Sequence, residues 1–199
     1  MTPAESGDSS DGSETRYAVI LDYLPHGRAD DDRPQYQKEP IAYALGETDF
    51  RLLELTMAED ADATIDDRVV VEPAEEREGV ERVRDIEFDD LSNGAQNELE
   101  YLVEDVIDAD ERRFVDFYND AQPITLRLHQ LNLLPGIGKK LRNNILDERK
   151  RGPFESFEEL EDRVSGLHRP KEVLVERITE ELRDDDLKYK VFVQREGSG

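Results

Sequence analysis

The sequence predicts an α+β protein in which a small N-terminal β-barrel is followed by an all-α domain and a terminal β-strand. Three observations support this fold class. Short β-prone segments separated by turn residues fill the first half of the chain, and helical periodicity begins near Ser92. Near the C-terminus, residues 187–194 have the alternation of a strand. We expect this strand to return to the barrel, because an isolated strand would leave its backbone groups unpaired.

Five short segments of the N-terminal half have the composition of strands. They are rich in β-branched, aromatic and leucine residues, and the loops between them contain Pro, Gly and Asp. Five short strands separated by turn signals fit a small barrel of the oligonucleotide-binding (OB) type. The predicted strands are residues 17–24, 41–45, 50–57, 67–72 and 80–88.

Helices are predicted throughout the second half of the chain. Ser92 can cap the first of them, whose apolar side chains recur at spacings of three and four residues. Ser156 opens a capping box, and Pro170 suits the first position of the last helix. The predicted helices begin near residues 92, 111, 125, 139, 156 and 171.

The helix predicted after residue 125 leads into a glycine-rich break. Thr125 can cap this helix, and Leu126, Leu128 and Leu131 would face inward. Residues 135–138 end it, and the next helix starts directly afterwards. The order of helix, tight turn and helix predicts a helix-hairpin-helix motif.

These patterns divide the chain into five parts. Residues 1–14 are expected to be a disordered acidic tail, because they are rich in Ser and Gly and lack the basic start and apolar core of a secretory signal. The OB-like barrel would occupy residues 15–91, connecting helices residues 92–122, and the helix-hairpin-helix domain residues 123–185. The C-terminal strand and tail would occupy residues 186–199.

The chain is strongly acidic. It has 50 Asp and Glu residues against 26 Lys and Arg residues, a formal charge of −24, and 19 arginines against 7 lysines. The acidic positions are spread among well-patterned apolar ones, as in haloarchaeal proteins, which work in molar salt that screens their self-repulsion. The alternative is an acidic mesophilic protein with a disordered, charged middle segment.

Composition excludes several kinds of site. The chain has no cysteine, so it has no disulfide and no thiolate metal site, and its three histidines are too scattered to suggest a zinc site. No apolar run approaches the roughly 20 residues that a membrane helix needs. We therefore expect a cytoplasmic monomer that binds no cofactor, no metal and no membrane.

One stretch departs from the acidity of the chain. Residues 135–151 hold six basic and two acidic side chains, a local charge of +4. Glycines in the turn leave room for a phosphate against the backbone, and the amides of the next helix point at the same place. A nucleic-acid-binding site is therefore predicted here. The candidate binding residues are Pro135, Gly136, Ile137, Gly138, Lys139, Lys140, Arg142, Arg149, Lys150 and Arg151.

The candidate residues have different expected roles. Ile137 would fill the small core between the helices, and Lys139 and Lys140 would reach phosphate oxygens. The basic residues from Arg149 onward favour the negative pole of the helix dipole and would touch a second strand of nucleic acid. Residues 156–182 resemble a degenerate second copy of the motif with one glycine missing, so a structural role is expected for that copy.

Other interpretations of these residues stay open. A Pro-Gly-x-Gly break is also an ordinary turn, and hairpin domains also bind proteins, so a protein-interaction module of an RNA- or DNA-processing assembly is the main alternative function. A metal-dependent nuclease would use the acidic runs at residues 30–32 or 184–186. A DNA glycosylase would need a catalytic carboxylate such as Asp162, with a base pocket around it. Most barrel aromatics belong to the core, but those beside basic residues are candidates for a second binding surface. These candidates are Tyr17, Tyr23, Tyr36, Tyr43 and Phe50, with Arg28, Arg33, Lys38 and Arg51.

The chain resembles an archaeal domain-of-unknown-function family, the one numbered 655. The resemblance covers about residues 16–194 and rests on residues 17–25, 92–107 and 133–140. It implies an OB-like barrel joined to a helix-hairpin-helix domain, and it implies RNA binding without known catalysis. The expected partners are therefore nucleic acid, with RNA preferred to DNA, and the ribosome or RNA-processing proteins.

Overall fold

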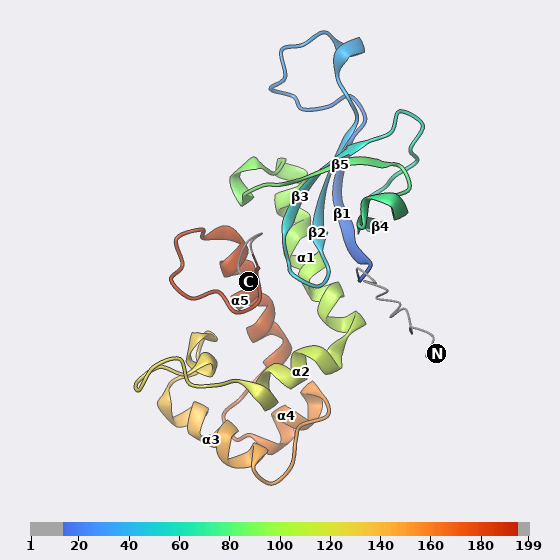
Figure 1. Ribbon diagram of the computed structural model, residues 1–199. Helices are drawn as coiled ribbons and strands as arrows, with labels where there is room; N and C mark the ends of the chain where they lie inside the picture. Colours follow the sequence, from blue (N-terminus) through green and yellow to red (C-terminus); the bar gives the residue numbers. More distant parts are fainter. Residues whose placement is uncertain (1–13, 195–199) are drawn as a thin grey trace, which may run out of the picture.

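The computed structural model describes residues 14–194 and begins with an antiparallel sheet that curls into a half-barrel (Figure 1). All five predicted strands are present, and their order in the sheet is β4-β1-β2-β3-β5. The predicted acidic tail lies outside the described residues apart from Glu14, as do residues 195–199. The strands are β1 (Arg16–Leu24), β2 (Ile41–Gly46), β3 (Leu52–Met57), β4 (Arg68–Glu72) and β5 (Val80–Asp85).

The sheet buries side chains on both of its faces, because neighbouring residues of a strand point in opposite directions. Along β1, Ala18 and Ile20 join the cluster inside the half-barrel, whereas Val19 and Leu21 join a larger cluster on the other face. The larger cluster continues into the helices. The sheet therefore has one face for its own interior and one face for the helical part.

Helices follow the sheet, and two of the predicted caps are confirmed. The Ser92 hydroxyl accepts the N–H of Ala95 at 3.1 Å, and the Ser156 hydroxyl accepts the N–H of Glu159 at 3.0 Å. The capping box predicted at Ser156 is only half formed, because the Glu159 carboxylate accepts the N–H of Glu155 instead of that of Ser156. No helix within residues 14–194 is long and apolar enough to span a bilayer. The α-helices are α1 (Asn93–Ala109), α2 (Glu111–Asp120), α3 (Lys139–Arg149), α4 (Phe157–Arg163) and α5 (Pro170–Arg183), and the 3-10 helices are η1 (Gln35–Gln37), η2 (Ala74–Glu76), η3 (Phe88–Asp90) and η4 (Gln130–Leu133).

One hydrophobic core joins the sheet to the helices. It extends from Leu21 and Phe50 in the sheet region through Leu99 of α1 and Phe114 of α2 to Ile178 of α5. The rings of Phe50 and Phe114 meet edge to face with their centroids 5.9 Å apart. The core is therefore continuous across the boundary that the sequence suggested near residue 91.

The predicted helix after Thr125 is wrong. The Thr125 hydroxyl accepts the N–H groups of Arg127 and Leu128 at 3.2 and 3.0 Å, so it stabilises a turn instead of capping a helix. Leu126, which was expected to face inward, is fully exposed. Between the end of α2 and the glycine-rich break, the helical structure consists of the short 3-10 helix η4.

The predicted C-terminal strand is also wrong, although the segment returns to the sheet as expected. The N–H of Gln194 donates to the carbonyl of Asp49 at 2.9 Å. The N–H groups of residues 191–193 all donate to one atom, Oε1 of Glu181, at 2.8 to 3.2 Å. A strand directs successive amides to opposite sides, so three amides on one oxygen exclude a ladder. Residues 187–194 form an irregular segment.

Candidate functional site

The glycine turn, which we define as residues 134–138, connects η4 to α3. Gly136 has a φ of 77°, a left-handed conformation that favours glycine. The N–H of Ile137 donates to the carbonyl of Leu134 at 3.2 Å, and both of these side chains are buried. The turn is therefore held by its own backbone and by two apolar side chains, one of which is the predicted Ile137.

The amides that follow the turn have no partner. Within the described chain, the N–H groups of Gly138, Lys139 and Lys140 donate no hydrogen bond, as expected for the first amides of a helix. All three residues are exposed, and a Cβ built on Gly138 would meet no atom within 4 Å. The start of α3 thus combines unpaired donors, open space and the positive end of a helix dipole.

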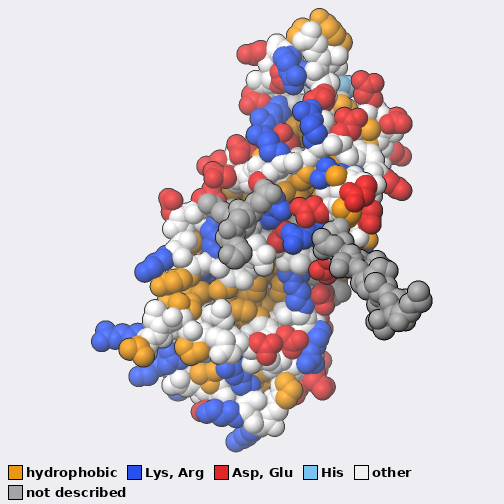
Figure 2. Space-filling view, viewed as in Figure 1, with side chains coloured by type: hydrophobic (Ala, Val, Ile, Leu, Met, Phe, Trp, Pro, Cys, Tyr) orange, Lys and Arg blue, Asp and Glu red, His pale blue; other side chains and the backbone are white. Residues whose placement is uncertain are grey.

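Two lysines at the start of α3 are available to a ligand. Lys139 and Lys140 form no ion pair with any residue from 14 to 194, and the first turn of α3 contains no acidic residue. Figure 2 shows Lys and Arg side chains around the outer edge of the helical part, whereas Asp and Glu side chains crowd the flank of the sheet part. The local positive charge predicted from the sequence therefore lies on the surface at this site.

Arg142 contributes to the structure of the turn. Its Nη1 donates to Oδ1 of Asn132 at 3.0 Å, and Nδ2 of Asn132 donates to the carbonyl of Ile137 at 3.2 Å. The same Oδ1 accepts the N–H of His129 at 3.2 Å. Sequence reasoning missed Asn132 and His129, because only the folded turn brings their partners together.

The basic residues at the other end of α3 lie apart from the turn, about 16 Å along the helix. Arg149 is half-buried, and its Nη1 donates to the carbonyls of Tyr118 and Ala121 at 3.1 and 3.0 Å. Lys150 and Arg151 are exposed, and each pairs at 3.4 Å with an acidic residue three positions earlier. The basic residues at this end of α3 are thus separate from the turn, and Arg149 makes hydrogen bonds within the fold.

A second turn of similar construction connects α4 to α5. Gly166 has a φ of 90°, and the N–H of Leu167 donates to the carbonyl of Val164 at 3.2 Å. Pro170, at the start of α5, has no N–H to offer. A Cβ on Gly166 would lie 3.7 Å from the Leu141 side chain of α3. The structural role expected for the second copy stays a prediction.

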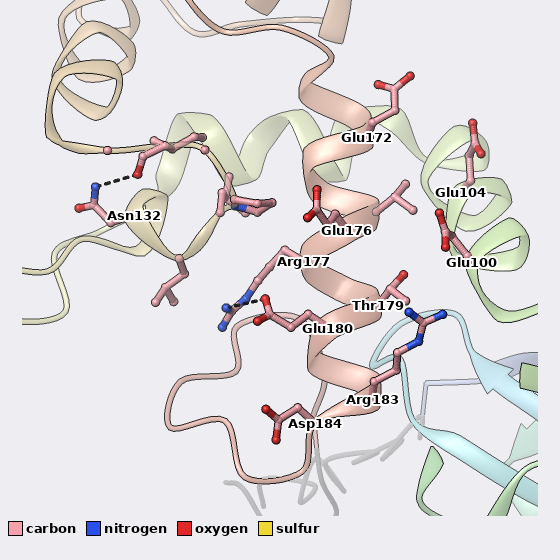
Figure 3. A pocket seen from close by; sticks show the side chains of 17 residues that line it. Glu100, Glu104, Asn132, Glu172, Glu176, Arg177, Thr179, Glu180, Arg183 and Asp184 are labelled. Carbon is pink, nitrogen blue, oxygen red and sulfur yellow. Dashed lines mark hydrogen bonds and ion pairs between the residues drawn. The ribbon is translucent and has the colours of Figure 1, made fainter. Parts of the chain in front are cut away.

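A groove of about 1180 Å³ lies beside the glycine turn, over α5 and next to α1 (Figure 3). We call it the acidic groove, because six acidic and only two basic side chains line it. Its field would repel a phosphate, so an anion is favoured to approach the turn from the side of α3. The acidic side chains are Glu100, Glu104, Glu172, Glu176, Glu180 and Asp184.

Other surfaces considered from the sequence offer less to a ligand. Tyr43 and Phe50 are buried, whereas Tyr36 is 85% exposed on its loop. Arg28 donates to the Glu54 carboxylate at 2.8 Å through Nε. In the part of the chain that the structure describes, no group of three or more His, Asp or Glu side chains is arranged to hold a metal.

We expect the stability of the turn to depend on the protonation of His129. Its Nδ1 accepts the N–H of Leu131 at 3.1 Å and so caps η4. Burial, with the charges of Arg149 and Arg142, lowers the pKa of His129, so the fold favours its neutral form. As the pH falls below about 6.5, the unfolded chain binds the proton first, and stability is lost until the folded pKa is passed.

His129→Asn tests this dependence, because the Asn amide oxygen accepts the same N–H at every pH. Urea unfolding of both proteins between about pH 7.5 and pH 5 measures the effect. We expect the free energy of unfolding of the wild type to fall relative to that of the variant as the pH is lowered. A difference that stays constant with pH would contradict the assignment. The two other histidines are present in both proteins, so their contributions to the pH dependence cancel in the difference.

The fold and the site define an α+β protein with a curled antiparallel sheet and two glycine-containing turns between helical segments. The family described as "Protein of unknown function (DUF655)" matches residues 14–194, so the chain belongs to this family and the resemblance inferred from the sequence is confirmed.

Two archaeal proteins are similar to this chain over most of its length. The uncharacterized protein MJ0038 of Methanocaldococcus jannaschii is 39% identical over 180 residues, which are 89% of this chain and 79% of that protein. The crystal structure of Af1531 from Archaeoglobus fulgidus, described with the same family, is similar with a TM-score of 0.81 at 42% identity. That similarity covers 90% of this chain and 99% of the other. Neither description states an activity.

Proposed function

We propose that the protein binds nucleic acid at the glycine turn and catalyses no reaction on it. The observation that supports this most directly is the set of three unpaired amides on exposed residues at the start of α3, beside two lysines without ion-pair partners. A phosphate placed there would gain hydrogen bonds and a favourable dipole interaction. In this proposal η4, the turn and α3 act as a helix-hairpin-helix motif, and the sheet is an OB-like barrel.

Binding through the backbone suits a chain with a net charge of −24. Ionic contacts to phosphate weaken steeply as salt rises. We propose that the acidic composition is a haloarchaeal adaptation, and that the amides of Gly138, Lys139 and Lys140 supply the contact that persists in molar salt. Structured RNA in the cytoplasm, ribosomal or other, is preferred to DNA on the family resemblance.

Gly138→Ala tests contact through the amides. Gly138 has a φ of −86° and a ψ of −171°, which any residue adopts, and its new methyl group meets open space, so the main cost is that of Ala at the N-cap of α3, and we expect stability to fall by about 1 kcal/mol or less. The methyl group would occupy the space where a phosphate approaches. We expect the affinity for a labelled RNA stem-loop to fall at least about tenfold, measured by fluorescence anisotropy. Gly136 is unsuitable for this test, because its φ of 77° would strain any other residue.

Two charge-matched double variants separate the turn from general charge. Lys139→Gln with Lys140→Gln removes two charges at the turn, and Lys150→Gln with Arg151→Gln removes two at the far end of α3. At about 0.1 M KCl we expect the double variant at the turn to lose more RNA affinity than the double variant at the far end of α3. The difference between the two losses should become smaller at molar salt. Equal losses would show that only overall charge matters. No binding of RNA or DNA by the wild type, or Mg²⁺-dependent cleavage of the RNA, would contradict the proposal.

A further inference from the structure

The acidic groove carries more negative charge than the protein neutralises. Two of its six carboxylates pair with basic residues of α5, at 3.0 and 3.3 Å. Glu100, Glu172 and Glu176 form no ion pair with any residue in the described range 14–194. Carboxylates that line one cavity repel each other, and a cationic occupant relieves this repulsion.

A buried hydroxyl in the same groove also lacks a partner. Thr179 lies on the side of α5 that faces α1 (Figure 3), is 4% exposed, and makes no hydrogen bond through Oγ1 with any described residue. Among residues 14–194 it is the one buried side-chain N or O atom without a partner. Buried polar groups are nearly always hydrogen-bonded, so this hydroxyl is the group in the groove to which an occupant would supply the missing bond.

The spacing of the carboxylates fits an extended peptide. Glu172, Glu176 and Glu180 recur every four residues, about 6 Å apart along the axis of α5. In an extended chain, alternate side chains lie about 6.6 Å apart on one face. Apolar side chains of the turn and of α5, among them Pro135 and Val175, also line the groove and can cover the aliphatic stems of Lys or Arg.

We propose that the acidic groove binds an extended segment of a partner protein in which Lys or Arg occupies alternate positions. The sign of the charge excludes nucleic acid as the occupant. A second copy of this chain is disfavoured, because placing the basic end of α3 into the groove of another copy is a head-to-tail contact that forms open chains unless it closes into a ring.

A labelled peptide of about ten residues with Arg at alternate positions, titrated into the full chain at about 0.1 M KCl, tests the proposal. We expect saturable binding that weakens at least about tenfold in Glu172→Gln with Glu176→Gln. The matched control is Glu158→Gln with Glu161→Gln, an equal charge change on exposed residues of α4, which should change affinity less than about twofold. No binding by the wild type, or equal losses in both double variants, would overturn the proposal.

Thr179→Val separates contact with the peptide from general electrostatics. Valine has nearly the same shape and removes only the unpaired hydroxyl, so we expect the thermal stability of the free protein to stay the same or rise. The peptide affinity should fall at least about threefold. Unchanged peptide affinity would overturn the role of the hydroxyl. If the free protein sediments as a dimer and the peptide dissociates that dimer, the occupant of the groove is a second copy of the chain. RNA binding gives a second readout with the opposite sign: Glu172→Gln with Glu176→Gln weakens the field that repels a phosphate at the turn, so RNA affinity should stay the same or rise while peptide affinity falls.

Discussion

Glu181→Ala is expected to lower the free energy of unfolding by about 3–5 kcal/mol. Glu181 is fully buried on α5, where Oε2 accepts Nε of Arg177 at 3.1 Å and Oε1 accepts three amides of residues 191–193. Alanine would leave the buried guanidinium without its close carboxylate and the three amides without an acceptor. The segment that returns to the sheet would then lose its attachment to α5.

Urea unfolding followed by circular dichroism measures this loss. The matched control is Glu180→Ala, because the exposed Glu180 also pairs with Arg177, at 3.3 Å, and exposed pairs contribute little. We expect the control to change stability by about 0.5 kcal/mol or less. A loss below about 1 kcal/mol for Glu181→Ala would show that the segment is held mainly by other contacts, such as the ring of Phe192 against Phe117.

Arg149→Gln is expected to reduce stability by about 2–3 kcal/mol and to leave the RNA affinity of the folded protein unchanged. The guanidinium donates to two carbonyls at the end of α2, and burial lowers the pKa of Arg149. Gln is too short to reach both acceptors, which would stay unpaired. This result would assign Arg149 to the fold, although the sequence suggests a phosphate contact.

Lys150→Gln is the matched control, because Lys150 is the next residue and its exposed ammonium pairs with Asp147 at 3.4 Å on the surface. We expect its stability to change by less than about 0.5 kcal/mol. Equal stability of the two variants in thermal unfolding would show that the carbonyls of Tyr118 and Ala121 do not depend on Arg149. A large loss of RNA affinity in folded Arg149→Gln would return this residue to the binding site.

The strands and most helices could be predicted because their signals are local. Pro, Gly and Asp mark the loops between strands, and Ser92, Ser156 and Pro170 mark helix starts through bonds or backbone preferences within a few residues. The position of the glycine turn is also predictable from nearby residues, because the turn needs a left-handed conformation and Gly136 adopts one. Local signals of this kind are present in the chain before it folds.

The errors have two sources: distant residues decide the structure of one segment, and a local side-chain hydrogen bond competes with the helix in another. Residues 187–194 alternate like a strand, but their amides bind Glu181, whose burial depends on the packing of α5. Leu126 and its neighbours have helical spacing by chance, and the Thr125 hydroxyl competes successfully for the local amides. The acidic face of α5 was missed for another reason: a four-residue spacing of Glu looks like an ordinary solvated helix surface until α1 and the glycine turn enclose it.

The continuous core also bears on how such a protein can change in evolution. The face of the sheet that carries Leu21 has no solvent-compatible surface of its own, because the helices complete its burial. A barrel separated from its helices would expose that face and be prone to aggregation. The two parts are therefore not exchangeable modules, because each covers apolar surface of the other.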